Sequence, residues 1–187
     1  MVAIIVVASV SIIGLYQFIG PEDDSILNFY VFGDSQGYQD GILEIAEIAN
    51  QERPDFVIHC GDLTPFGQSN QYDEVISALD TFIVPVYTTV GNHDIHEGGG
   101  ARYLQHFGSS TYSFDSGPIH FTIFNTSTND VSETEMTWLE NDLSQSSSEI
   151  KFVFTHTPPF DPRTGPDHGM LNVTRAQQLM ALFEAQD

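Results

Sequence analysis

The sequence predicts an α/β fold in which strands and helices alternate through the first half of the chain. Three apolar segments, Ile26–Phe32, Phe56–His59 and Val84–Val90, have the length and composition of buried strands. Segments with helical spacing of apolar residues separate them, and this alternation is typical of crossover connections on a sheet. The second half differs, because the turn-rich link Asp115–Pro118 joins two strand-like segments and indicates a hairpin.

Two helices are predicted between the first three strands. Asp40 is a candidate cap for a helix over Gly41–Glu52, and Pro54 stops that helix before the next strand. The apolar residues of this helix recur at helical spacing: Ile42, Ile45, Ala46 and Ala49. The second helix has the same period at Tyr72, Val75, Ile76 and Leu79. Each helix therefore has one apolar face, of the kind that covers a sheet.

The second half is predicted to contain the hairpin, another helix, one more strand and a final helix. Its strands are Thr111–Phe114, Ile119–Asn125 and Lys151–Thr155. Ser132 and Glu135 stand in the register of a capping box, which starts a helix that ends at Leu143. We expect Thr174 to cap the last helix.

The composition predicts a single globular domain with a strongly acidic surface. A length of 187 residues and a hydrophobic fraction of 41% suffice for one sizeable core. The 26 acidic residues outnumber the 5 basic ones, and the formal net charge is −21. This charge repels polyanions, so nucleic-acid binding is not expected. It suits surroundings rich in salt, and it permits a phosphate substrate where a bound metal inverts the local field.

Three residues with reactive side chains are interpreted as structural. Cys60 is the sole cysteine, which excludes an internal disulfide, and its apolar neighbours predict a small core residue. His59, inside a strand, is predicted to be a core residue or a neighbour in the strand ladder rather than a metal ligand. His120 alternates with apolar neighbours and is predicted to lie on the surface of its sheet.

The first 20 residues form a separate hydrophobic segment. Val2–Gly20 is uncharged and mostly apolar, and the acidic run Pro21–Asp24 follows it. Its length is close to that of a spanning helix, so we expect a membrane anchor or export signal over residues 1–20, with the domain outside the cytoplasm. A buried helix and a displaced start are the alternatives. Residues 21–27 are then a linker, and residues 28–187 form the domain.

Four motifs place polar side chains directly after apolar segments, where α/β sheets build their sites. They are Gly33-Asp34-Ser35-Gln36, Gly61-Asp62-Leu63, Gly91-Asn92-His93-Asp94 and Thr155-His156-Thr157-Pro158-Pro159. Together they supply Asp34, Asp62, Asn92 and His156. This set of oxygen and nitrogen ligands suits two divalent metals that share a bridging carboxylate.

The motif series resembles that of the calcineurin-like metallophosphoesterase family from about Asn28 to the end of the chain. That family has Asp-x-His, Gly-Asp, Gly-Asn-His-Asp/Glu, a lone His and Gly-His-x-His in this order, and Gly91–Asp94 is the most specific match. The resemblance implies a four-layer α/β/β/α sandwich of metallophosphoesterase type, with the last strands missing. It also implies an enzyme that hydrolyses a phosphomonoester or a phosphodiester.

The resemblance further implies a dinuclear metal centre. Asp62 takes the bridging position, because the two oxygens of one carboxylate can hold two cations. Asp34 would bind the first metal, with weak help from Gln36, whereas Asn92 and His156 would bind the second. The ligand types admit Mn, Fe or Zn as the two divalent metal ions. A hydroxide held between the metals would be the nucleophile.

Other residues have implied roles in catalysis and in substrate binding. His93 would donate a proton to the leaving oxygen or stabilise its developing charge, and Asp94 would orient its imidazole. Arg163 and His168, on the loop after the lone His, are candidates for contacts with the phosphate of the substrate. The expected partner is a phosphate-ester substrate. Membrane attachment through residues 2–20 is expected in addition, and no feature of the sequence indicates an oligomeric state.

Two departures from the family pattern leave other functions open. Gln36 stands where the family usually has His, so the first metal should be held less tightly. No Gly-His-x-His motif follows before Asp187, and we expect a truncated chain, with a degenerate pseudoenzyme as the alternative. The rival functions are a noncatalytic module that binds a phosphorylated ligand and a structural domain tethered to a membrane.

Overall fold

The computed structural model describes residues 2–3, 14–19, 26–162 and 168–186, which form two four-stranded sheets and five α-helices. The first sheet has the order β2-β3-β4-β5 and the second β1-β8-β7-β6. The strands of the first sheet are β2 (Gly14–Ile19), β3 (Ile26–Phe32), β4 (Phe56–His59) and β5 (Val86–Thr88). Those of the second are β1 (Val2–Ala3), β6 (Tyr112–Ser116), β7 (Ile119–Ile123) and β8 (Ile150–Phe154).

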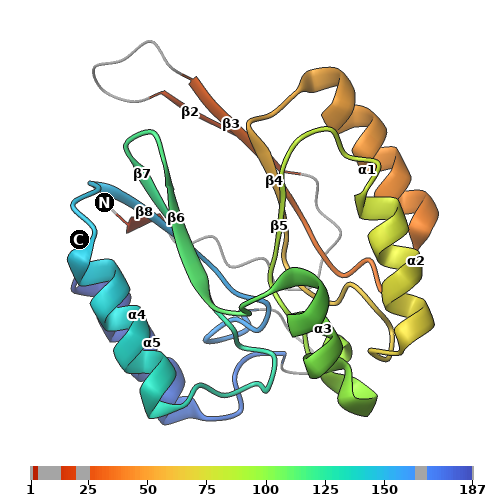
Figure 1. Cartoon of the computed structure of the whole chain (residues 1–187). Helices are drawn as coiled ribbons and strands as arrows, with labels where there is room; N and C mark the ends of the chain where they lie inside the picture. Colours follow the sequence, from red (N-terminus) through yellow and green to blue (C-terminus); the bar gives the residue numbers. More distant parts are fainter. Residues whose placement is uncertain (1, 4–13, 20–25, 163–167, 187) are drawn as a thin grey trace.

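The helices lie on the two outer sides of the pair of sheets (Figure 1). They are α1 (Gln39–Glu52), α2 (Ser69–Leu79), α3 (Gly99–Phe107), α4 (Glu133–Gln145) and α5 (Val173–Glu184). A short 3-10 helix, η1 (His93–Gly98), leads into α3. Helices α1 and α2 cover the first sheet, whereas α4 and α5 cover the second.

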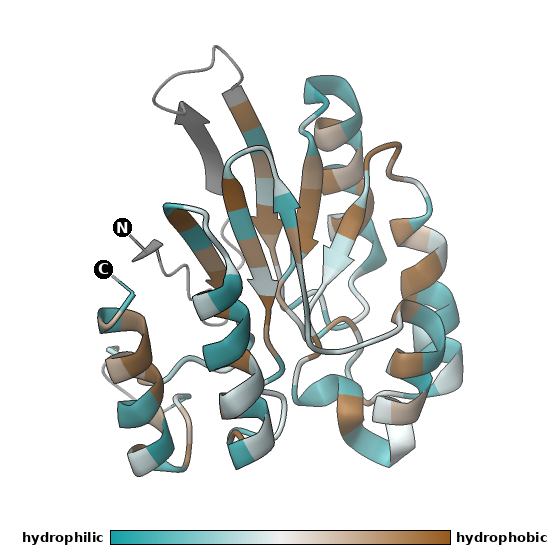
Figure 2. Cartoon of the chain, turned by 60° about the vertical axis from the view of Figure 1, so that its left-hand side comes forward, coloured by the Kyte–Doolittle hydropathy of each residue, from teal (hydrophilic) through white to brown (hydrophobic). Residues whose placement is uncertain are grey.

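Three apolar clusters fill the spaces between these layers. The cluster between the two sheets is dominated by aromatic rings, and Phe29 stacks on Phe56 with ring centroids 5.3 Å apart. Phe29 and Val31 of β3 belong to this cluster, whereas Tyr30 and Phe32 belong to the cluster beneath α1 and α2. This alternation follows from the two-residue period of a strand. Figure 2 shows the apolar residues concentrated on the strands.

The third cluster lies between the second sheet and helices α4 and α5. It joins Val153 of β8 to Leu139 of α4 and to Leu179 and Phe183 of α5, all buried. The predicted α/β class and the four-layer α/β/β/α sandwich are therefore confirmed, because each outer helical layer has its own apolar contact with a sheet.

The parallel strands of the first sheet end side by side. Phe32 of β3 is paired with His59 of β4, and His59 is paired with Thr88 of β5. Each is the last residue of its strand. The loops that carry the first three motifs therefore leave the sheet at one edge.

Several element boundaries differ from the prediction. Helix α1 begins at Gln39 without a side-chain cap, so Asp40 lies in its first turn and does not cap it. Asn172, rather than Thr174, caps α5, because its side-chain oxygen accepts from the backbone N–H of Arg175 at 3.1 Å. The capping box of Ser132 and Glu135 at α4 is confirmed.

His120 is buried, which corrects the prediction of a surface position. Helix α4 covers its face of the sheet, so the side chain that alternates with apolar neighbours meets a second layer rather than water. Its Nδ1 lies 2.7 Å from the carboxylate of Asp115, and its Nε2 lies 3.1 Å from that of Asp142 on α4. Thr122 also donates to Asp142, at 2.7 Å.

The hydrophobic segment expected to act as an anchor or export signal lies largely outside the described residues. Of residues 1–20, the structure describes Val2–Ala3, which pairs with β8, and Gly14–Ile19, which pairs with β3. Across the described ranges, no helix combines the length and hydrophobicity needed to cross a membrane.

Candidate metal centre

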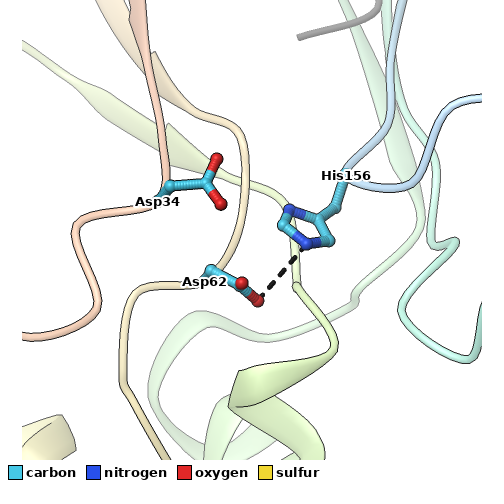
Figure 3. A group of neighbouring side chains, drawn as sticks. All are labelled: Asp34, Asp62 and His156. Atoms are coloured by element: carbon cyan, nitrogen blue, oxygen red, sulfur yellow. Dashed lines mark ion pairs between the residues drawn. The ribbon is translucent and has the colours of Figure 1, made fainter. Parts of the chain in front are cut away.

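The candidate site lies where loops from the two sheets meet. Asp34 follows β3, Asp62 follows β4 and Asn92 follows β5, so three side chains come from the first sheet. His156 follows β8 of the second sheet. Because the carboxyl ends of parallel strands share one edge, these loops converge. Figure 3 shows Asp34, Asp62 and His156 around a common point.

Four of the predicted metal ligands come together there. Asp34, Asp62 and His156 each offer a ligand atom, and these atoms lie within 4.8 Å of one another. His156 Nε2 lies 3.3 Å from Asp62 Oδ1, the contact dashed in Figure 3, and 3.0 Å from Asn92 Oδ1. The side chains of Asp62 and His156 are only 4% and 6% exposed, so a bound cation would be well shielded from water.

The orientation of His156 favours a cation. Its Nδ1 lies 2.9 Å from the carbonyl oxygen of Cys60, which only accepts, so Nδ1 carries the proton. In the neutral ring, the lone pair on Nε2 points toward the oxygens of Asp62 and Asn92. This lone pair and the two oxygens repel one another unless a positive charge lies among them. The donor set therefore fits a divalent metal, and the Cys60 carbonyl fixes the tautomer that such a metal needs.

The backbone of the first two loops is held in the left-handed region. Asp34, Gln36 and Asp62 have φ values of 55°, 43° and 54°. The loops are joined by hydrogen bonds from Asp34 N to Gly61 O at 3.0 Å and from Gln36 N to Asp62 O at 2.8 Å. Such conformations are unfavourable for residues other than glycine and persist where the surrounding structure fixes them, which is common at functional sites.

Gln36 lies beside the cluster with its amide nitrogen directed at Asp62. Its Nε2 is 3.5 Å from Asp62 Oδ2. In this orientation the residue supports the carboxylate as a hydrogen-bond donor, whereas a metal ligand would present its amide oxygen. The weak contribution to metal binding expected from the sequence therefore stays a prediction.

His93 is placed to act in the cleft. Its Nδ1 lies 2.8 Å from the carbonyl oxygen of Pro65, so Nδ1 is the donor. The opposite nitrogen, Nε2, lies 3.9 Å from Asp62 Oδ2, and its side chain is 35% exposed. The backbone N–H of His93 donates to Asp62 Oδ1 at 2.9 Å.

The expectation that Asp94 orients the His93 imidazole is corrected. The carboxylate of Asp94 is fully buried and accepts four hydrogen bonds from other groups. The donors are Gly91 N at 2.8 Å, Leu63 N at 3.2 Å, Thr64 N at 2.8 Å and Thr64 Oγ1 at 3.0 Å. Asp94 therefore joins the loops of the second and third motifs, and the carbonyl of Pro65 orients His93. Burial raises the pKa of Asp94 from 3.8 to about 6.

His59 and Cys60 are core residues, as predicted. His59 is fully buried, and its Nε2 lies 2.9 Å from the Oγ of Ser35, which follows Asp34 in the sequence. Burial lowers the pKa of His59 to about 3, so the ring is neutral. Burial also raises the pKa of the Cys60 thiol above its usual range, which leaves it protonated and unreactive.

The cluster opens into a cleft of about 280 Å³. It is lined by seven residues predicted from the sequence: Asp34, Gln36, Asp62, Asn92, His93, His156 and His168. His168 is exposed, and its backbone N–H donates to Asp161 Oδ2 at 3.2 Å. Arg163 lies outside the described residues. The sequence did not point to Asn129 or Leu171, which line the same cleft. Asn129 lies on the loop between β7 and α4, which carries no recognisable motif, and Leu171 lies beyond the fourth motif on the loop between β8 and α5.

The chain belongs to the calcineurin-like phosphoesterase family, whose sequence pattern matches residues 27–182. This match includes every loop of the cleft. The chain is 30% identical over 126 residues to the probable cyclic nucleotide phosphodiesterase RPA0124 of Rhodopseudomonas palustris. That alignment covers 60% of this chain and 46% of the relative, so the chain spans less than half the length of this curated protein.

Solved structures share the fold at low sequence identity. A dimetal phosphatase from Danio rerio superimposes with a TM-score of 0.62 and 16% identity, over 84% of this chain and 77% of that one. GAP50, the anchor in the inner membrane complex of Plasmodium, gives 0.65 and 15% over 84% and 62% of the two chains. A purple acid phosphatase from yellow lupin seeds gives 0.57 and 17% over 72% and 33%.

Proposed function

We propose that this domain hydrolyses a phosphate ester with the help of two divalent metal ions, of which Mn, Fe and Zn suit the ligands. The observation that carries the proposal is the convergence of Asp34, Asp62 and His156, whose ligand atoms lie within 4.8 Å. Divalent cations held by these residues and Asn92 supply Lewis-acid activation of water and offset the charge of the phosphoryl group. Membership of the calcineurin-like phosphoesterase family supports the same activity.

Asp62 is assigned the bridging position. Both of its oxygens face the cluster: Oδ1 is 3.3 Å from His156 Nε2, and Oδ2 is the oxygen nearest to the Gln36 amide and the His93 ring. Asp34 would hold one metal, and Asn92 and His156 would hold the other. Two cations that share one carboxylate would both offset charge on a single phosphoryl group.

His93 is assigned the role of general acid. Because its Nδ1 donates to Pro65, the Nε2 atom is the one available in the cleft. In the protonated ring, this atom can donate to the leaving oxygen as the ester bond breaks, or stabilise the charge that develops there. His168 and Arg163 are proposed to contact the phosphate of the substrate from the neighbouring loop.

The test is hydrolysis of two chromogenic probes by the full chain in the presence of Mn²⁺. Bis(p-nitrophenyl) phosphate tests diester cleavage and p-nitrophenyl phosphate tests monoester cleavage. The name of the Rhodopseudomonas relative favours the diester as the first probe. We expect Mn²⁺-dependent hydrolysis that Asp62→Asn lowers at least about a hundredfold, since one neutral amide cannot bridge two cations.

The matched control is Asp73→Asn, which makes the same chemical change on an exposed position of α2. It should leave hydrolysis unchanged. Equal activity of the wild type and Asp62→Asn would overturn the assignment of the metal centre.

A second candidate is a noncatalytic module that binds a phosphorylated ligand. It is favoured by Gln36, whose amide nitrogen faces Asp62 where the family pattern has a histidine. This function predicts metal-dependent binding of inorganic phosphate without turnover of either probe. Hydrolysis that Asp62→Asn abolishes would exclude it.

A further inference from the structure

We propose that Asn129 binds the substrate, with its side-chain amide donating a hydrogen bond to an oxygen of the phosphate group. This inference rests on the proposed function, because it concerns the same cleft. Asn129 lies on the loop between β7 and α4 and lines the cleft with the metal-binding residues. It approaches from the second sheet, as His156 does, whereas Asp34, Asp62 and His93 approach from the first.

The backbone of Asn129 is fixed from two directions. Its N–H donates to the carbonyl of Thr126 at 2.9 Å, and its own carbonyl accepts from the N–H of Leu171 at 2.9 Å. Its φ is 58°, a left-handed conformation that asparagine tolerates better than most residues. The loop therefore holds the residue in one place before any ligand arrives.

The side chain is oriented by Thr157, the neighbour of His156. The Thr157 hydroxyl donates to Asn129 Oδ1 at 2.8 Å. Because the oxygen side of the amide is engaged, the nitrogen side is directed away from Thr157 and offers two N–H donors. Within the described residues, no acceptor forms a hydrogen bond with this nitrogen.

An uncharged donor suits a cleft that is lined by carboxylates. The first two motifs contribute Asp34 and Asp62, which repel a phosphate oxygen where no metal offsets them, and Gln36, whose amide nitrogen faces Asp62. An amide N–H supplies a favourable contact to an anionic oxygen and does not compete for the metal as a third carboxylate would. Asn129 is thus a binding residue for the phosphate rather than a metal ligand.

Two substitutions separate this role from a structural one. Asn129→Asp keeps an oxygen acceptor for Thr157 and tolerates the same φ, but it replaces the donor by a negative charge. Asn129→Gly keeps the left-handed backbone without strain and removes the side chain. A merely structural residue would be replaced well by Asp and poorly by Gly. A phosphate donor is lost in both variants.

The measurement is calorimetric titration of the full chain, loaded with Mn²⁺, with inorganic phosphate. We expect both variants to bind phosphate at least about tenfold more weakly than the wild type, since a hydrogen bond to a charged group is lost. Mn²⁺ affinity, measured first, should stay within about threefold of the wild type in Asn129→Gly. Asn70→Asp adds the same charge at an exposed position of α2 and should bind phosphate normally.

The outcomes distinguish the inference from the function on which it rests. Phosphate binding by Asn129→Asp equal to that of the wild type would overturn the inference and leave the proposed metal centre intact. Phosphate binding that is absent in the Mn²⁺-loaded wild type would overturn the proposed function, and the inference with it.

Discussion

Protonation of His59 is predicted to weaken the fold in mild acid. The imidazole is fully buried at the end of β4, with Nε2 2.9 Å from Ser35 Oγ and its ring edge-on to Phe32 at a centroid distance of 4.5 Å. Burial, and then the nearby His156, lower the pKa of His59 from 6.5 to about 3. The His59 imidazole therefore binds a proton near pH 6.5 in the unfolded chain but only at about pH 3 in the folded chain.

The sign and size of the effect follow from this gap. The stability that neutral His59 contributes is fully present above pH 6.5 and is lost as the pH falls toward 3. Each pH unit below the unfolded pKa costs about 1.4 kcal/mol, so the loss is about 2 kcal/mol at about pH 5. Asp94 acts in the opposite sense, because its pKa is raised to about 6 and its contribution to stability is lost as the pH rises through that value.

The assay compares the wild type with His59→Gln by urea unfolding between about pH 7.5 and pH 5, with EDTA and constant salt. Glutamine keeps a nitrogen donor for Ser35 but does not titrate. The contribution of Asp94 is common to both proteins and cancels in the difference. We expect the stability gap between them to narrow by about 2 kcal/mol toward pH 5. Parallel pH profiles of the two proteins would show that burial does not keep His59 neutral.

Three further predictions concern the loops and the surface. Asp94→Ala leaves four buried donors without an acceptor, so it should lower the free energy of unfolding in urea by about 3 kcal/mol or more. A loss below about 1 kcal/mol would show that Asp94 does not link the two loops. Gly91→Ala places a methyl group against the backbone N and Oδ1 of Asp62 and should weaken Mn²⁺ binding at least about tenfold. Gly100→Ala makes only ordinary van der Waals contact with Ile95 and should not weaken it, so equal Mn²⁺ affinities of the two variants would contradict the prediction. Because the net charge is −21, KCl should screen the repulsion between acidic side chains and raise the thermal midpoint of unfolding. A midpoint that does not change with KCl would show that this repulsion does not lower the stability of the fold.

Much of the fold could be predicted because its local signals agree with its packing. The strands Ile26–Phe32 and Phe56–His59 were predicted with the bounds that the structure has, since Phe29–Phe32 and Phe56–His59 are buried on both faces. The span predicted as Val84–Val90 contains only the short strand Val86–Thr88. Helix α3 was missed, because its glycine-rich start after η1 gives no periodic apolar signal.

The gathering of the site could be predicted because each motif directly follows a strand. Parallel strands that end in register bring Asp34, Asp62 and Asn92 to one edge, and the sandwich brings His156 to them from the other sheet. The order of the elements is sufficient to predict this convergence, without knowledge of side-chain packing.

Contacts that depend on loop conformation could not be read from the sequence. The Pro65 carbonyl that orients His93 is a backbone group. Every residue has such a carbonyl, so the residue type at position 65 does not indicate this contact. Asn129 lies on a loop of ordinary composition, and its side chain is oriented in the cleft by a hydrogen bond from the Thr157 hydroxyl. His120 is buried because α4 covers its face of the second sheet. The alternation of polar and apolar residues in the strand does not show which face a helix covers.

We infer that the loops of both sheets form a binding site for divalent cations. Calorimetric titration of the full chain with Mn²⁺ tests it most directly, with Asp62→Asn and the exposed Asp73→Asn measured beside the wild type. We expect saturable Mn²⁺ binding by the wild type and by Asp73→Asn, and an affinity at least about tenfold lower in Asp62→Asn. Absence of saturable binding in the wild type, or equal affinity in Asp62→Asn, would contradict it.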